Sequence, residues 1–206
     1  MQMEKNYLQF VNLHDPVSIT GRQLPHWQQG ECVQFVTFRL ADSLPQSRLD
    51  EMRVLREDWL SHHPRPWSRK EEQEYADTVS DKLEQWTDAG YGECLLQEER
   101  VRRVVAEAIG HFHGSRYQLH AFVIMPNHVH VLLSPLAGYS VQDIVGSWKV
   151  YSARAVNRLL HRSGPLWERA CFDHMVRNAD SFREKLDYIL RNPRHLPLST
   201  YTLVVV

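Results

Sequence analysis

Segments with strand-like spacing of apolar residues alternate along this chain with segments of helical spacing. Residues 33–41 divide between two faces with a period of two, which predicts a β-strand. Residues 98–113 carry apolar side chains at i, i+3, i+4, i+7 and i+8, which predicts an amphipathic helix. Two further apolar runs, 117–125 and 128–134, predict strands that a short proline-containing turn joins into an antiparallel pair.

The remaining periodic segments predict helices and one short strand. Residues 47–60 and a long segment after residue 140 have the apolar spacing of helices that bury one face. A short strand near 173–177 precedes a helix that Asp180 can cap and that Pro193 should end. Antiparallel strands covered by helices predict an α+β fold with a ferredoxin-like arrangement, in which the helices lie mainly on one face of the sheet.

The segment 62–96 differs from the rest of the chain. It is rich in charge, contains Pro64 and Pro66, and has few apolar residues. We expect a charged helical insertion on the surface of a single domain that spans residues 1–206. Such an insertion could serve as a lid or an arm over a site.

Composition bounds the class of protein. No apolar run reaches the 18 or more residues that a membrane-spanning helix needs, and the first residues lack the apolar core of a signal peptide. We therefore expect a cytoplasmic protein without a membrane partner. Cys32, Cys94 and Cys171 are isolated and odd in number and have no CxxC spacing, which argues against a disulfide framework and against a thiolate zinc site.

Two histidines interrupt the most apolar strand of the chain. His128 and His130 flank Val129 within the run Val123-Ile-Met-Pro-Asn-His-Val-His-Val-Leu-Leu133. Alternate residues of a strand point the same way with Cα atoms roughly 6.5 Å apart, so both imidazoles could bind one metal ion. The alternative is a pair of buried histidines satisfied by hydrogen bonds.

The phrase Met125-Pro-Asn-His-Val-His-Val-Leu-Leu133 resembles the signature of the IS200-like tyrosine transposases of the HUH superfamily, most of all the REP-associated tyrosine transposases. The resemblance implies a HUH-type single-strand nuclease fold with a helix that carries a nucleophilic tyrosine and, four residues later, an amide ligand. Tyr188 and Asn192 have that spacing, and i and i+4 share one helical face. Alternatively, Tyr188 is a half-buried core residue and Asn192 a plain helix cap.

The resemblance implies an enzyme that nicks and rejoins single-stranded DNA next to hairpins such as REP palindromes. His128, His130 and Asn192 would hold Mg²⁺ or Mn²⁺, and Tyr188 would attack phosphorus to give a 5′-phosphotyrosine intermediate. Such a protein would be associated with the nucleoid, as a monomer or a homodimer. Two alternatives remain: a non-catalytic hairpin- or REP-binding protein derived from such a transposase, and a small metallohydrolase that adds Asp or Glu ligands to the two histidines.

The charge distribution agrees with a nucleic-acid partner. The net charge is −1, but residues 1–100 hold 11 Lys and Arg against 18 Asp and Glu, whereas 101–206 hold 13 against 7. Basic side chains supply most of the sequence-independent affinity for a phosphate backbone. We expect backbone contacts from Lys149, Arg154, Arg158, Arg177 and Arg191. Trp148 is a candidate for stacking on a base, and the alternative that helical periodicity favours is a core position.

Overall fold

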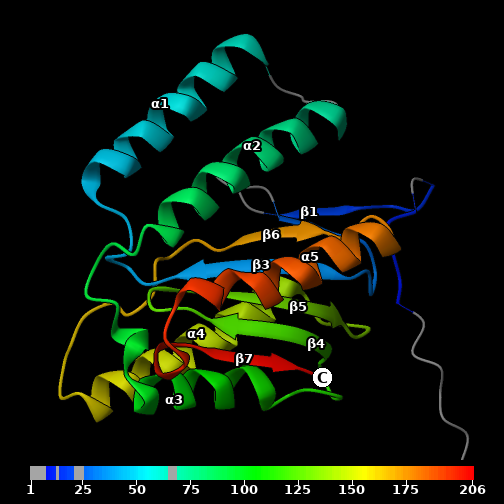
Figure 1. Cartoon of the computed structure of the whole chain (residues 1–206). Coiled ribbons are helices and arrows are strands. Elements are labelled where there is room, and N and C mark those ends of the chain that lie inside the picture. The colour runs from blue at the N-terminus through cyan, green and yellow to red at the C-terminus, as the bar shows by residue number, and fades with distance from the viewer. Residues whose placement is uncertain (1–7, 13, 21–25, 65–68) are drawn as a thin grey trace, which may run out of the picture.

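The central element of the fold is a five-stranded antiparallel sheet. The computed structural model describes residues 8–12, 14–20, 26–64 and 69–206. The strands lie in the order β6-β3-β5-β4-β7, which Figure 1 shows across the middle of the molecule. Their bounds are Gln34–Arg39 for β3, Tyr117–Ile124 for β4, His128–Pro135 for β5, Phe172–Met175 for β6 and Thr202–Val205 for β7.

Strand β5 lies in the middle of the sheet, paired with β3 on one side and β4 on the other. All of its residues are buried, which explains why its sequence is an almost continuous apolar run rather than an alternating one. The turn between β4 and β5 closes where the Met125 N–H donates to the His128 carbonyl at 2.8 Å. The predicted antiparallel pair is therefore confirmed.

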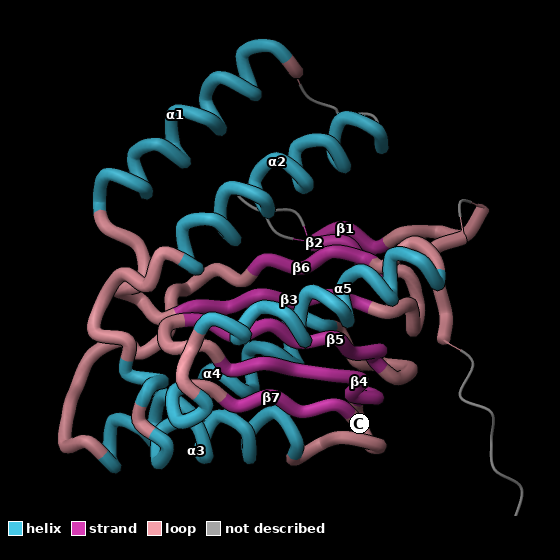
Figure 2. Tube along the Cα trace, in the orientation of Figure 1, coloured by secondary structure: helices cyan, strands magenta, loops and turns pink. Residues whose placement is uncertain are grey.

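Helices cover both faces of the sheet. Helices α3 (Glu99–Gly110) and α4 (Val141–Leu159) pack together on one face, and α5 (Ala179–Arg191) lies across the other, as Figures 1 and 2 show. The predicted α+β class with an antiparallel sheet is confirmed. Two of these three helices share a face, and the third lies on the face that carries His128 and His130.

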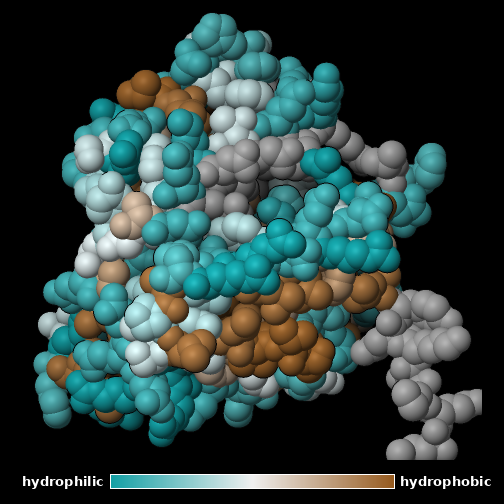
Figure 3. All heavy atoms as spheres, viewed as in Figure 1, coloured by the Kyte–Doolittle hydropathy of each residue, from teal (hydrophilic) through white to brown (hydrophobic). Residues whose placement is uncertain are grey.

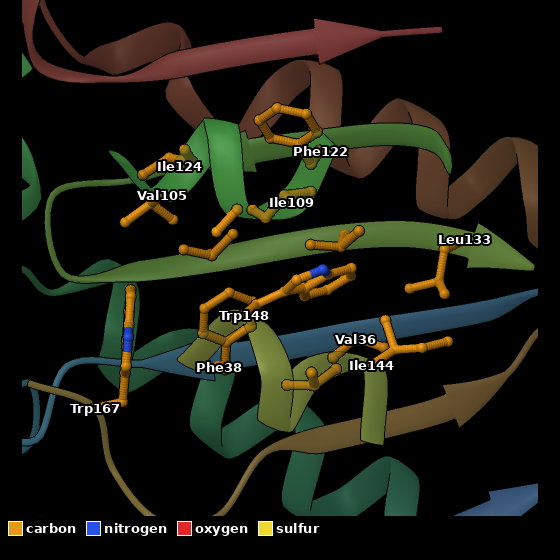
Figure 4. Close-up of a cluster of buried hydrophobic side chains, with 14 of the residues drawn as sticks. Val36, Phe38, Val105, Ile109, Phe122, Ile124, Leu133, Ile144, Trp148 and Trp167 are labelled. Carbon is orange, nitrogen blue, oxygen red and sulfur yellow. The ribbon is translucent and has the colours of Figure 1, made fainter. Parts of the chain in front are cut away.

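The larger core lies between the sheet and helices α3 and α4, and Trp148 is at its centre (Figure 4). The Trp148 side chain is 2% exposed and packs against Phe38, and its indole N–H donates to the Tyr117 hydroxyl at 3.0 Å. That hydroxyl in turn donates to the Ile109 carbonyl at 2.6 Å. The prediction that Trp148 stacks on a DNA base is wrong, because its ring and its polar edge are occupied inside the core.

Helices α1 (Gln46–His62) and α2 (Arg69–Asp88) project together beyond the β6 edge of the sheet (Figure 1). They are joined by an aromatic contact between Trp59 and Tyr75, whose ring centroids are 5.6 Å apart, and by the Arg48 guanidinium over the Trp86 ring at 5.4 Å. The segment expected as an insertion corresponds to α2 and the residues after it. The last residue of α2, Asp88, lies next to the sheet, beside His128 of β5.

The first end of α5 differs from the sequence expectation, and the second agrees with it. Asn178, rather than Asp180, caps the helix, since its side-chain oxygen accepts the Ser181 N–H at 2.8 Å. The α-helix ends at Arg191, before Pro193, as predicted, and the chain continues as a 3-10 turn over Asn192–His195 with the proline in its first turn. In the first turn of a helix the N–H groups have no acceptor within the helix, so a proline without an N–H loses no hydrogen bond at that position.

One edge of the sheet is exposed and apolar, and the other is covered by a second, small sheet. β7 is preceded by the 3-10 turn Leu198–Thr200 and leaves apolar side chains exposed, with Val205 at 55% and Val206 at 65%, and Figure 3 shows apolar atoms gathered over this edge. At the opposite edge, β1 (Ser18–Thr20) and β2 (His26–Gln28) form a small antiparallel sheet, and β2 packs against β6. None of the helices in the described ranges has the length and apolar character that crossing a bilayer requires.

His120 on β4 should make folding sensitive to acid. Its Nε2 is 2.9 Å from the Ser134 hydroxyl, and burial together with His113 lowers the pKa of His120 to about 4. An unfolded histidine has a pKa of about 6.5, so between these values the unfolded chain binds more protons and the free energy of unfolding falls as the pH drops from about 6.5 toward 4. His120→Gln should reduce the slope of the unfolding free energy against pH by at most about 1.4 kcal/mol per pH unit. Urea unfolding in chelator at several pH values measures the slope, and equal slopes for the two proteins would contradict the prediction.

Candidate active site

His128 and His130 begin strand β5 and lie side by side on the face that α5 covers. Their side chains are 1% and 0% exposed, and their ring centroids are 4.6 Å apart with the ring planes at 76°. His130 also stacks on Phe35 of β3 at 5.4 Å. The alternation of the strand thus brings the two imidazoles together, as the sequence predicts.

Both rings are oriented by a hydrogen bond at Nδ1. The Asn127 side-chain oxygen accepts from His128 Nδ1 at 2.8 Å, and the Thr37 hydroxyl bonds His130 Nδ1 at the same distance. The acceptor at His128 fixes the proton on Nδ1, which leaves the lone pair on Nε2. A partner of this kind at the far nitrogen is typical of histidines that bind metals.

Burial also fixes the charge state of the pair. It lowers the pKa of His128 to about 3, and burial, His128 and the Lys185 ammonium together lower the pKa of His130 well below its usual range. Both rings are therefore neutral near pH 7, which is the form that can bind a cation.

Asp88 is the residue that the sequence did not indicate. At the end of α2, its Oδ1 lies 3.5 Å from His128 Nε2, and the ligand atoms of Asp88, His128 and His130 all lie within 4.8 Å of one another. Burial raises the pKa of Asp88, while the Asn192 amide and His195 oppose that shift. No local pattern in the sequence distinguishes Asp88 from the other acidic residues of its segment. Its position beside the histidines follows only from the way the end of α2 packs against the sheet.

Asn127 connects the end of α2 to His128. Its amide nitrogen donates to the Thr87 and Tyr91 carbonyls, at 3.1 Å each, while its oxygen holds the His128 ring. The side chain is 1% exposed. Asn127 therefore sets the distance between Asp88 and the histidines.

Asn127→Ala should weaken metal binding about 10- to 100-fold, because the loss of a group that orients a metal ligand has that effect. The expected change appears in Mn²⁺ titration by calorimetry. Asn157→Ala is the matched control, since the Asn157 amide bonds the Gly164 carbonyl, at 2.9 Å, on the other face of the sheet. Unchanged affinity in a folded Asn127→Ala protein would contradict this role.

Tyr188 lies on α5 directly over the histidine pair. Its hydroxyl is 3.4 Å from His130 Nε2, and its ring contacts the rings of His130 and Phe35 edge-on, at 5.1 and 5.9 Å between centroids. The Lys185 ammonium, one turn earlier on α5, is 5.8 Å from the Tyr188 ring centroid. The tyrosine hydroxyl and a cationic side chain thus meet at the two imidazoles.

Asn192 lies at the junction between α5 and the 3-10 turn and reaches the same group. Its amide nitrogen donates to Asp88 Oδ1 at 3.4 Å, and the residue is 9% exposed. Asn192 Oδ1 is buried without a hydrogen-bond partner among the described residues, and so is His128 Nε2. Two buried acceptors without donors, beside a carboxylate, are what a divalent cation would satisfy.

The donor set fits a divalent cation. Two imidazole nitrogens of β5 and a carboxylate oxygen of α2 converge, and the amide nitrogen of Asn192, at the end of α5, bonds that carboxylate. These nitrogen and oxygen atoms form a group able to hold a metal ion, and the structure adds Asp88 to the residues predicted there, His128, His130 and Asn192.

The basic residues predicted to bind DNA divide between the two faces. Lys149, Arg154 and Arg158 lie on α4, across the sheet from the histidines, so their predicted DNA contacts would lie on the other face from the histidine pair. Lys149 Nζ donates instead to the Glu168, Arg169 and Ala170 carbonyls at 2.6, 2.9 and 3.3 Å. The other two candidates remain exposed near α5: Arg177 just before the helix, and Arg191 at its end, 3.6 Å from Asp187.

Comparison with known proteins agrees with the two motifs. Residues 93–191 match the family model of IS200-like transposases, which confirms the resemblance over that segment of the chain. The matched segment contains His128, His130 and Tyr188, whereas Asp88 and Asn192 lie just outside it. No curated protein matches the chain.

Two solved structures resemble the chain at low similarity. One is a REP-associated tyrosine transposase bound to a REP hairpin, with 14% identity, a TM-score of 0.43, and coverage of 81% of this chain and 68% of that chain. The other is a candidate transposase from Deinococcus radiodurans, with 16% identity, a TM-score of 0.34, and coverage of 84% and 96%. At these scores neither likeness supports a statement about the site.

Proposed function

We propose that this protein is a metal-dependent single-strand DNA transesterase that nicks and rejoins DNA next to hairpins through a 5′-phosphotyrosine intermediate. The observation that carries the proposal is the position of the Tyr188 hydroxyl, 3.4 Å from His130 Nε2 and beside the group formed with His128 and Asp88. The match of residues 93–191 to IS200-like transposases supports the same class of reaction.

In the proposed reaction, the Tyr188 oxygen forms a bond to phosphorus while the bond from phosphorus to the 3′ oxygen breaks. The tyrosine loses its proton and the departing 3′ oxygen gains one. Because the phosphodiester is exchanged rather than hydrolysed, the reverse attack by a 3′-hydroxyl rejoins a strand without ATP. A divalent cation, when bound, would polarise the scissile phosphate and offset its developing charge.

The protein residues have separate tasks in this scheme. His128, His130, Asp88 and Asn192 would hold the cation, Mg²⁺ or Mn²⁺. Asn127 and Thr37 would keep the imidazoles turned toward it. Lys185 lies near enough to the tyrosine to attract the phosphate that the hydroxyl attacks. Arg177 and Arg191, beside the ends of α5, are the remaining candidates for contacts to the DNA backbone.

The substrate that we propose is single-stranded DNA adjoining a hairpin of the REP-palindrome type, bound by a monomer or a homodimer. Incubation of the protein with hairpin oligonucleotides and Mn²⁺ should give a protein–DNA adduct and a fragment with a free 3′-hydroxyl. Binding without nicking under any divalent cation would favour the non-catalytic hairpin-binding alternative instead.

Asp88 also strengthens the metallohydrolase alternative, because it supplies the acidic ligand that this alternative lacked in the sequence. The two functions differ in their dependence on α5. A hydrolase would keep its metal in Asn192→Ala and would cleave without Tyr188, whereas the transesterase needs both residues. Metal titration of Asn192→Ala and cleavage by Tyr188→Phe decide between them.

A further inference from the structure

A second group of metal-binding side chains lies on the opposite face of the sheet. The ligand atoms of His26 on β2, of Cys171 just before β6 and of Asp173 on β6 all lie within 4.8 Å of one another. Asp173 pairs with Val36, whose side chain belongs to the core under α4, and Cys171 packs against that same core. The group therefore shares no residue with the histidine pair of β5 and is separated from it by the sheet.

We propose that His26, Cys171 and Asp173 form a zinc-binding site that ties the small sheet of β1 and β2 to the edge strand β6. The choice of metal rests on the ligands, because a thiolate together with an imidazole selects Zn²⁺ over the hard cations that suit the other site. Three protein ligands leave one position of a tetrahedral ion for water.

The geometry needs little adjustment to accept the ion. Metal–ligand distances of about 2.0 to 2.3 Å place the ligand atoms of a tetrahedral zinc roughly 3.3 to 3.8 Å apart. His26 Nδ1 and Asp173 Oδ1 are in direct contact, closer than two ligand atoms of one zinc ion, so they must move apart for the ion to replace the proton that they can share. The other atoms of the group must approach one another by about 1.5 Å at most.

One atom of the group has no partner among the described residues. The Asp173 side chain is fully buried, and its Oδ2 lacks a hydrogen bond even though Oδ1 contacts His26. A buried carboxylate oxygen without a donor is costly, and a cation between the three side chains would remove that cost.

A bound zinc ion would leave the group electrically neutral. Burial and the Asp173 carboxylate raise the pKa of the Cys171 thiol to about 11, and burial raises the pKa of Asp173. Without a cation the thiol therefore stays protonated near pH 7. A dication bound by thiolate, carboxylate and neutral imidazole gives a group with no net charge, which a buried site tolerates best.

The surrounding backbone is held in place for such a site. Lys149 Nζ donates to the three successive carbonyls of residues 168–170, which fixes the segment that leads into Cys171. On the other side, Gln34 Nε2 donates to the Trp27 carbonyl at 3.0 Å, which joins β2 to the main sheet next to His26. The ligands thus come from two segments that are each anchored independently of the ion.

Cobalt titration of the full-length protein tests the proposal, because the active-site donors described above include no thiolate. Co²⁺ should give a near-ultraviolet thiolate-to-cobalt absorption band that one equivalent of Zn²⁺ removes. The band should persist in Cys94→Ser and disappear in Cys171→Ser; both cysteines are partly exposed, so the variants are matched. No band in the wild-type protein, or a band that survives Cys171→Ser, would overturn the site.

Thiol protection gives a second measurement that needs no variant. One equivalent of Zn²⁺ should slow alkylation of Cys171 at least about tenfold, since a bound thiolate is no longer a free nucleophile, and should leave Cys94 unchanged. Peptide mapping by mass spectrometry reads the two cysteines separately. Equal alkylation of Cys171 with and without zinc would also overturn the proposal, whatever the outcome for DNA nicking.

Discussion

Tyr188→Phe should abolish the covalent protein–DNA adduct, by at least about 10³-fold, and leave hairpin DNA binding within about twofold. The substitution removes only the hydroxyl that would attack phosphorus. The phenyl ring keeps the edge-on contacts with His130 and Phe35 that hold it in place, at 5.1 and 5.9 Å. Binding should survive because the charges that attract a phosphate backbone are unchanged.

The measurement is a denaturing gel of 3′-labelled hairpin oligonucleotide incubated with Mn²⁺, since a 5′-phosphotyrosine leaves the 3′ fragment on the protein. Tyr151→Phe is the matched control, because Tyr151 is 56% exposed on α4, across the sheet from the histidines. An adduct formed by the Tyr188→Phe protein would disprove the nucleophile. Loss of the adduct in the control would show that the assay does not isolate one tyrosine.

Asp88→Asn should weaken Mn²⁺ binding at least about tenfold and reduce nicking in parallel. The amide keeps the size of the side chain but removes the negative charge beside His128 Nε2, to which Asp88 Oδ1 is 3.5 Å away. A dication gains much of its affinity from that charge, whereas the amide oxygen can still accept a hydrogen bond from Asn192.

Calorimetric titration of Mn²⁺ into the protein measures the effect. Asp187→Asn is the control: Asp187 neighbours Tyr188 on α5, but its side chain is 60% exposed and pairs with Arg191. Equal Mn²⁺ affinities for the Asp88→Asn and wild-type proteins would mean that Asp88 serves only as the acceptor of the Asn192 amide, and the ligand set would return to the two histidines and Asn192.

The local elements of this protein follow from the spacing of apolar residues. The strand pair 117–125 and 128–134 and the helix 98–113 are predicted close to their observed bounds, because their periods are long and uninterrupted. Helix ends are predicted less well. Asn178 takes the capping position expected of Asp180, because neighbouring caps have similar strength, whereas the end of the helix before Pro193 is predicted correctly.

The cysteines show what sequence spacing leaves out. Their spacing in the chain argues against a thiolate site, yet folding brings Cys171 next to Asp173 and to His26, which lies far earlier in the chain. Ligands that converge from separate strands leave no periodic signal, because the pairing of β6 with β3 and the packing of β2 against β6, rather than sequence spacing, set the distances between them.

The sequence by itself determined the antiparallel α+β class, the shared direction of His128 and His130, and the shared helical face of Tyr188 and Asn192. Each of these depends only on the period of a strand or a helix. Only the tertiary structure decided which distant side chains join them, because the packing of whole elements sets those distances. It brings Asp88 from α2 to the histidines, buries Trp148, and places Lys149, Arg154 and Arg158 on the far face.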